Sequence, residues 1–140
     1  MTGIENLIRA NEDGTLAFGD CTLESKKKKD GFEYGGDVYE VKTFREITKL
    51  ECNESFVYES VPGTVVDEFQ ETEDGMSFLV RGEADAQLTV GLTSECDYRV
   101  TLDGKEIGVI TTDLGGKLSF NVPLEGSTRP VDVKISEVRK

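Results

Sequence analysis

The residue types that most often carry catalysis are sparse in this chain of 140 residues. It contains no histidine, which excludes Ser-His-Asp and Cys-His arrangements and His-ligated metal sites. The cysteines, Cys21, Cys52 and Cys96, are widely spaced and lack a CxxC pair or a visible activating partner. Neither a GxxxxGKS/T phosphate loop nor a GxGxxG motif opening a helix is present. We therefore predict thiols in a reducing compartment, with no catalytic residue, metal centre or cofactor.

Carboxylates are the one abundant reactive group, with 28 Asp and Glu residues against 16 Lys and Arg residues. Two carboxylates at a suitable separation suffice for glycoside hydrolysis, so a small carboxylate-dependent glycoside hydrolase is one hypothesis. Oxygen ligands for calcium could come from residues 11–14, or from a cluster made of Asp67, Glu68, Glu71, Glu73 and Asp74. Neither segment matches a twelve-residue calcium loop, so solvated acidic turns are the simpler interpretation.

The most concentrated positive charge is a run of four lysines, Lys26, Lys27, Lys28 and Lys29. This run could bind an acidic partner or a phosphate group, and it could contact residues 67–74 of another copy. Lysines near the end of a strand also protect a sheet edge against pairing with other chains. The net charge of −12 disfavours general nucleic-acid binding and docking on anionic lipid, both of which need clustered positive charge.

Most aromatic residues fall between residues 32 and 58, and the tyrosines of this stretch are Tyr34, Tyr39 and Tyr58. With Phe32, Phe44 and Phe56 they would form a binding platform if they were exposed. Core filling is the simpler alternative for most of them. The candidate interaction residues are therefore Tyr34, Tyr39 and Tyr58 together with Lys26, Lys27, Lys28 and Lys29.

Apolar and polar residues alternate over most of the chain, which is typical of strands that bury one face. In residues 98–103, for example, Tyr98, Val100 and Leu102 alternate with polar residues. Asp-Gly pairs at residues 13, 30, 74 and 103 predict hairpin turns, and Asn53-Glu54 predicts another. Residues 21–27 are predicted to form a strand, and residues 2–10 a helical turn or the first arm of a hairpin.

We predict about ten to twelve short strands and little helix, which must close to bury their apolar faces. The expected fold is an all-β antiparallel β-sandwich of jelly-roll or immunoglobulin-like type. Residues 1–140 are expected to form a single domain, with a possible soft seam near residues 61–63. Since no apolar run reaches a membrane span and no secretory pattern begins the chain, we expect a cytoplasmic location without membrane contact.

Two stretches resemble known groups of proteins. Tyr98-Arg-Val-Thr-Leu-Asp-Gly-Lys, with Gly108-Val-Ile-Thr-Thr and Gly116-Lys-Leu-Ser-Phe, resembles the terminal β-sandwich modules appended to many bacterial polysaccharide-degrading enzymes. The whole chain, notably Tyr39-Glu-Val-Lys-Thr-Phe44 and Phe56-Val-Tyr-Glu-Ser-Val-Pro-Gly63, is similar to short bacterial proteins often labelled endosialidase. The first resemblance implies a fold. The second carries over no catalytic residue, because the arginines are scattered without the motif of sialic-acid hydrolases.

The function expected from these observations is a non-catalytic protein-interaction or assembly module. It would self-associate as a homo-oligomer or bind a protein partner, through an edge strand or the aromatic first half. The alternatives are a carbohydrate-binding accessory domain, for which a glycan would be the ligand, and the small hydrolase already named.

Overall fold

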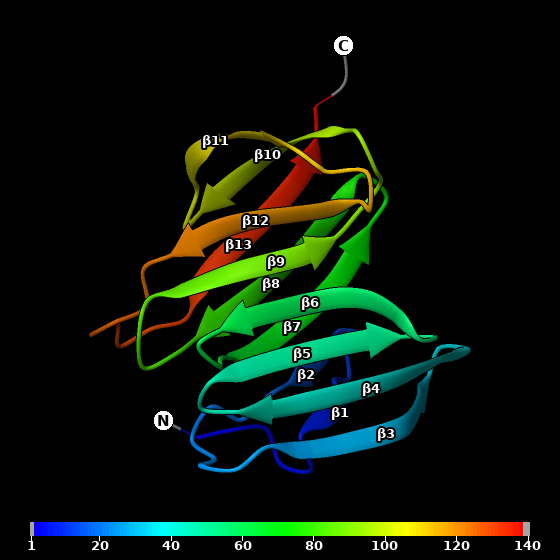
Figure 1. The fold of residues 1–140 in the computed structure, drawn as a ribbon, viewed down its shortest axis with the longest axis vertical. Helices are drawn as coiled ribbons and strands as arrows, with labels where there is room; N and C mark the ends of the chain where they lie inside the picture. The colour runs from blue at the N-terminus through cyan, green and yellow to red at the C-terminus, as the bar shows by residue number, and fades with distance from the viewer. Residues whose placement is uncertain (1, 139–140) are drawn as a thin grey trace.

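The computed structural model describes residues 2–138 and contains thirteen strands in two antiparallel sheets that face each other (Figure 1). The first sheet has the strand order β1-β2-β7-β8-β13-β10-β11, and the second has the order β12-β9-β6-β5-β4-β3. The predicted all-β sandwich is confirmed, with one strand more than the predicted range. Residues 2–138 include no helix, and so none that could cross a membrane.

The strands are short and follow one another through tight turns. The first sheet comprises β1 (Ile8–Ala10), β2 (Leu16–Phe18), β7 (Val65–Thr72), β8 (Gly75–Arg81), β13 (Val131–Glu137), β10 (Asp97–Leu102) and β11 (Lys105–Thr111). The second comprises β12 (Lys117–Val122), β9 (Ala86–Gly91), β6 (Ser55–Val61), β5 (Ile47–Cys52), β4 (Asp37–Phe44) and β3 (Lys27–Tyr34).

One hydrophobic core lies between the two sheets, and its residues come from alternate positions of the strands. In β12, for instance, Leu118, Phe120 and Val122 are buried while the residues between them are exposed. The centre of the core is aromatic, with edge-to-face contacts from Phe18 to Tyr58 and Phe69 at ring-centroid distances of 5.3 and 5.6 Å. Residues 61–63 cross from the second sheet to the first, and this core draws residues from both sides of the crossing.

Two local predictions are wrong. Residues 21–26 are irregular rather than a strand, and β3 begins only at Lys27. Asp30-Gly31 is not a hairpin turn, because it lies inside β3 where the register with β4 shifts. Gly31 has a φ of 66°, so the glycine serves a bulge instead, and the chain turns at Gly35-Gly36.

Other turn predictions are confirmed. Asn53 and Glu54 connect β5 to β6, and Asp103 and Gly104 connect β10 to β11. All four residues have a positive φ, as a two-residue hairpin turn of type I′ requires. Of the two alternatives for the N-terminal residues, the hairpin arm is observed, since β1 pairs with β2.

A fully buried network of hydroxyl groups joins the second sheet to the crossing that leads into β7. Thr64 is its centre: its Oγ1 lies 2.7 Å from the Tyr58 hydroxyl and 2.8 Å from Ser60 Oγ. The Thr64 backbone N–H donates to Thr48 Oγ1, which in turn donates to the Thr64 carbonyl at 2.9 Å. Thr43 Oγ1 lies 2.8 Å from Thr48 Oγ1. These residues have no exposed surface, so each polar group depends on its partners inside the network.

Replacing Thr64 by Val should lower the free energy of unfolding by about 2 kcal/mol, because buried hydroxyls of Tyr58 and Ser60 lose a partner. The measurement is urea denaturation, with Thr89→Val as control, since the Thr89 hydroxyl pairs with Ser119 at the surface. Combining Thr64→Val with Tyr58→Phe should cost less than the sum of the single changes. Additive losses would contradict the network.

Candidate functional site

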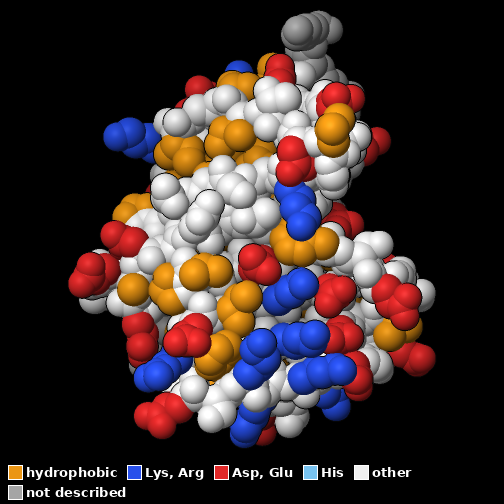
Figure 2. All heavy atoms as spheres, viewed as in Figure 1, with side chains coloured by type: hydrophobic (Ala, Val, Ile, Leu, Met, Phe, Trp, Pro, Cys, Tyr) orange, Lys and Arg blue, Asp and Glu red, His pale blue; other side chains and the backbone are white. Residues whose placement is uncertain are grey.

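The strongest surface feature of the described chain is a group of lysines on β3 and its neighbours. We call it the lysine surface and define it as Lys26, Lys27, Lys28, Lys29, Lys42 and Lys49. Figure 2 shows Lys and Arg side chains gathered over the part of the molecule formed by β3, β4 and β5. β3 is an edge strand of its sheet, so this surface covers an edge as well as a face.

Three of these lysines stand in one row across three neighbouring strands. Lys28 of β3 lies opposite Lys42 of β4, which lies opposite Lys49 of β5. Lys42 and Lys49 alternate with the buried residues Val41 and Leu50, so their side chains point away from the core. Like charges directly opposite each other on a sheet are destabilising, so the row costs the fold some stability.

Acidic groups offset this row only in part, and Glu59 of β6, which lies opposite Lys49, ends it. The Glu40 carboxylate lies 3.6 Å from Lys42 Nζ and 3.9 Å from Lys28 Nζ, and Asp30 lies 3.5 Å from Lys28 Nζ. These ion pairs are solvated, and such pairs contribute little to stability. The lysine surface therefore keeps positive charge available to a binding partner.

A groove beside β3 extends the lysine surface toward the N-terminal segment. It has a volume of ≈ 760 Å³, within the range typical of ligand sites, and lies between residues 2–7 and the lysines of β3, with Asp20 also in its lining. Lys27 and Lys29 pair with the buried residues Thr43 and Val41, so they lie on the side of β3 that faces this groove. One edge strand thus carries Lys28 in the row on the outer face and Lys27 and Lys29 on the opposite side, and all three line the groove.

The three candidate tyrosines do not form one surface. Tyr58 has no exposed surface and belongs to the hydroxyl network, so it is not available to a partner in the folded protein. Tyr39 is half-buried against the core opposite Cys52. Only Tyr34, 37% exposed beside the Gly35-Gly36 turn, lies open to solvent. Core filling therefore explains the position of Tyr58 and the buried part of the Tyr39 side chain.

The surroundings of the Tyr39 hydroxyl disfavour its deprotonated, negatively charged form. Burial is the main cause that raises the pKa of its hydroxyl, and the neighbouring Cys52, Asp37 and Glu71 raise it further. Burial also raises the pKa of the Cys52 thiol. Neither group is activated as a nucleophile by this environment, since activation requires a lowered pKa or an adjacent base.

The raised pKa of Tyr39 predicts a pH dependence of stability. The unfolded chain loses this proton near pH 10, whereas the folded chain retains it to higher pH. Stability from Tyr39 is therefore complete below about pH 10 and is lost as the pH rises through the folded pKa. Urea denaturation from neutral pH to about pH 11 should show a shallower decline for Tyr39→Phe than for the wild type. If the free energy of unfolding declined equally with pH in both proteins, the raised pKa of Tyr39 would be contradicted.

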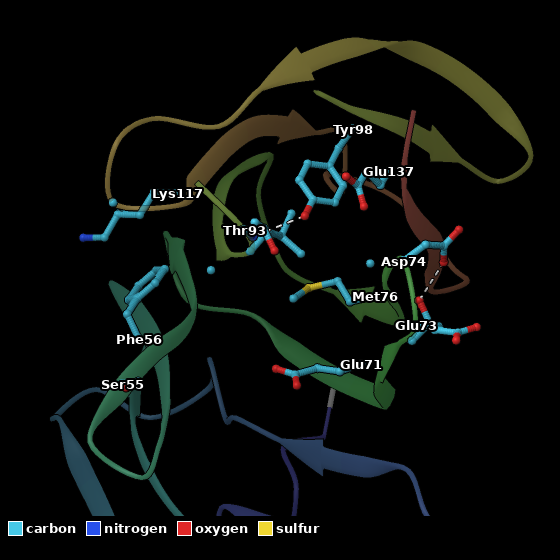
Figure 3. A pocket seen from close by; sticks show the side chains of 15 residues that line it. Ser55, Phe56, Glu71, Glu73, Asp74, Met76, Thr93, Tyr98, Lys117 and Glu137 are labelled. Atoms are coloured by element: carbon cyan, nitrogen blue, oxygen red, sulfur yellow. Dashed lines mark hydrogen bonds between the residues drawn. The ribbon is translucent and has the colours of Figure 1, made fainter. Parts of the chain in front are cut away.

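A second hollow, which we call the end cleft, opens between the sheets at the end of the sandwich where β6 and β8 begin (Figure 3). It has a volume of ≈ 490 Å³ and is lined mainly by polar side chains, among them Ser55, Glu71, Glu73, Asp74, Thr93, Tyr98 and Glu137. The Tyr98 hydroxyl accepts a hydrogen bond from the Thr93 backbone N–H at 3.2 Å. Lys117 Nζ lies 4.7 Å from the centre of the Phe56 ring and so occupies one face of that ring.

The acidic segments considered for calcium are used in other ways. Asp13 Oδ1 accepts hydrogen bonds from the backbone and hydroxyl of Thr15, which also lowers the pKa of this carboxyl. Asp67 accepts from Asn11 Nδ2 at 2.9 Å and pairs with Arg9. Within residues 2–138, no group of three or more acidic, cysteine or histidine side chains is arranged to hold a metal ion.

Comparison with known proteins identifies no relative: no protein-family model matches the chain, and no curated protein or solved structure is significantly similar to it. The candidate site therefore rests on the geometry alone. Sequence reasoning found Lys26–Lys29 but missed Lys42 and Lys49. The available signal was the two-residue connection Arg45-Glu46, which places Lys42 opposite Lys49 once β4 and β5 are seen to form a hairpin.

Proposed function

We propose that this chain is a non-catalytic protein-interaction module that binds an acidic segment of a partner protein through the lysine surface. The observation that carries the proposal is the row Lys28, Lys42 and Lys49 on three adjacent strands. In a chain with a net charge of −12, this row concentrates positive charge on one small area. Complementary charge of this kind steers encounter with an acidic surface and selects against other partners.

Protection of an edge strand accounts for only part of the lysine surface. Lys27, Lys28 and Lys29 lie on the edge strand β3, where charge discourages unwanted pairing. Lys42 and Lys49 lie on β4 and β5, which are paired on both sides and need no such protection. Their place in the row instead supports a binding role.

The groove beside β3 supports a partner in extended conformation. It lies beside the first residues of an edge strand, where Lys27, Lys28 and Lys29 line it. An extended acidic segment could therefore meet positive charge on both sides of β3. The attraction would weaken with added salt, because the lysines of β3 are exposed and Lys42 and Lys49 are only half-buried.

Charge reversal tests this proposal. An oligoglutamate peptide should bind the wild type at low salt, and Lys28→Glu/Lys42→Glu/Lys49→Glu should weaken binding by about tenfold or more, with stronger binding at low than at high salt. Fluorescence anisotropy of the labelled peptide is the measurement. The matched control is Lys105→Glu/Arg129→Glu/Lys134→Glu, which makes the same change of charge at exposed positions elsewhere. Equal losses in both triple variants would refute a defined lysine site.

Glycan binding in the end cleft is the second candidate, with or without hydrolysis. The cleft favours it because hydroxyl and carboxylate groups there could bond to sugar hydroxyls. A glycan array combined with a glycoside substrate screen tests it. A response that Glu71→Gln abolishes would support this candidate, and no response from the wild type would remove it.

A further inference from the structure

The outer face of the second sheet separates its charges into rows of one sign. Beside the positive row Lys28, Lys42 and Lys49 lies a negative row, in which Glu40 of β4 is directly opposite Glu51 of β5. Figure 2 shows acidic side chains beside the lysines on this face. Like charges opposite each other on two strands destabilise a sheet, whereas opposite charges stabilise it. In a single copy, both rows therefore cost stability.

Asp30 extends the negative row onto β3. It lies in the bulge between Lys29 and Phe32, which faces Glu40. Its carboxylate is 3.5 Å from Lys28 Nζ, so it lies on the same outer face. Each of the three strands thus carries one lysine of the positive row and, two positions along the strand, one acid of the negative row. Because two residues of a strand rise about 7 Å, the rows run side by side at roughly that separation.

We propose that this face binds the same face of a second copy, about a twofold axis that lies between the two rows and parallel to them. The axis crosses β3, β4 and β5 at Lys29, Val41 and Leu50, which lie opposite one another in the sheet. A half-turn about this axis exchanges the two rows, so the positive row of each copy meets the negative row of the other. The face is therefore self-complementary, as a twofold interface requires.

Charge complementarity identifies a second copy as the occupant. On each strand, the half-turn brings together residues that lie at equal distances on either side of the axis. Every lysine of the positive row then meets an acid of the other copy: Lys28 meets Asp30, Lys42 meets Glu40, and Lys49 meets Glu51. Sheets that pack face to face lie about 10 Å apart, a gap that a Lys and a Glu side chain bridge from opposite sides.

The flanking residues match as well. Beyond the lysines, Phe44 is half-buried, and Lys26 Nζ lies 5.7 Å from the centre of its ring. Beyond the acids, Val38 is 43% exposed, and Glu33 of β3 lies opposite it. The half-turn places Phe44 against Val38 of the other copy and Lys26 near Glu33. An acidic segment would match the positive row alone, whereas a second copy matches the whole face.

The association should be weak and concentration-dependent. Glu59, which ends the positive row on β6, meets Phe56 of the other copy, so the matched charges end at β5. The matched area measures roughly 20 Å along the strands and about 15 Å across them. This is smaller than the roughly 800 Å² per partner of a standard interface, as in transient complexes. The net charge of −12 also opposes approach, although salt screens that repulsion beyond about 10 Å.

The inference goes beyond the proposed function but uses the same lysines. A second copy and an acidic segment would compete for the positive row. The dimer would therefore keep the lysine surface covered until an acidic partner displaced the second copy, and oligoglutamate should convert dimer to monomer.

Placing the two signs on different molecules tests the pairing. Lys42→Glu/Lys49→Glu makes both rows acidic on β4 and β5, and Glu40→Lys/Glu51→Lys makes both rows basic there. In sedimentation velocity of the wild type, the fraction at twice the 15.4 kDa chain mass should rise with concentration. Each variant alone should have a dimer Kd raised by about tenfold or more, because like charges then meet across the axis. An equimolar mixture of the two variants should recover the dimer, since acids then meet lysines.

The matched controls make the same changes of charge at exposed positions outside this face, as Lys105→Glu/Lys134→Glu and Glu12→Lys/Glu125→Lys. Near 0.15 M salt, where long-range repulsion is screened, each control should keep a dimer Kd within about threefold of the wild type. A wild type that stays monomeric at about 1 mM would overturn the proposal. So would a monomeric mixture of the two face variants, or controls that lose the dimer as fully as those variants do.

The oligoglutamate assay separates this inference from the proposed function. Glu40→Lys/Glu51→Lys keeps every residue of the lysine surface, so it should bind the peptide at least as tightly as the wild type while no longer pairing with itself. Peptide binding together with a dimer that the face variants leave intact would refute only the twofold interface. A dimer recovered in the mixture, without peptide binding by the wild type, would refute only the proposed binding of acidic segments.

Discussion

The requirement that buried polar groups be paired governs the centre of this fold. Thr64 lies where the chain crosses between the sheets, and its hydroxyl and backbone bond to Tyr58, Ser60 and Thr48 without contact with water. Each of these groups would be costly if it were left unsatisfied, so the network permits one arrangement of the crossing against β5 and β6. The adjacent aromatic contact between Tyr58 and Phe18 then joins the two sheets.

Once the second sheet is fixed in this way, its outer face follows from turn geometry. The two-residue connection between β4 and β5 sets their register, and the register sets which charges are neighbours. Lys42 and Lys49 become adjacent for this reason, although the sequence separates them by seven residues. The lysine surface is therefore a product of hairpin pairing, and a shift of one residue in either strand would turn these lysines toward the core.

Alternation and turn chemistry were sufficient to predict the all-β sandwich and several hairpins, because a period of two and a demand for positive φ are local properties. The prediction of a hairpin turn at Asp30-Gly31 was wrong for the same local reason, since a bulge and a turn both use a glycine of positive φ. The sequence left Tyr58 open between a surface platform and the core, because its buried hydroxyl partners, Ser60 and Thr64, are polar residues that a pattern of apolar residues does not mark as buried. The connection between β4 and β5 is Arg45-Glu46, which contains neither Gly nor Asn. The sequence therefore did not mark this connection as a hairpin turn, and the pairing of Lys42 with Lys49 was not predicted.

Electrostatics opposes association of this protein with itself at long range, and the edge strands β3 and β11 differ in how they respond to charge. A net charge of −12 makes copies repel one another at long range, and this repulsion is screened beyond about 10 Å at moderate salt. β3 exposes positive charge, so added salt screens its attraction for any acidic group. β11 exposes backbone groups and the β-branched side chains of Ile107 and Val109, whose interactions do not depend on the Debye length. Added salt therefore weakens the attraction of an acidic group to β3 more than it weakens contact with the exposed groups of β11.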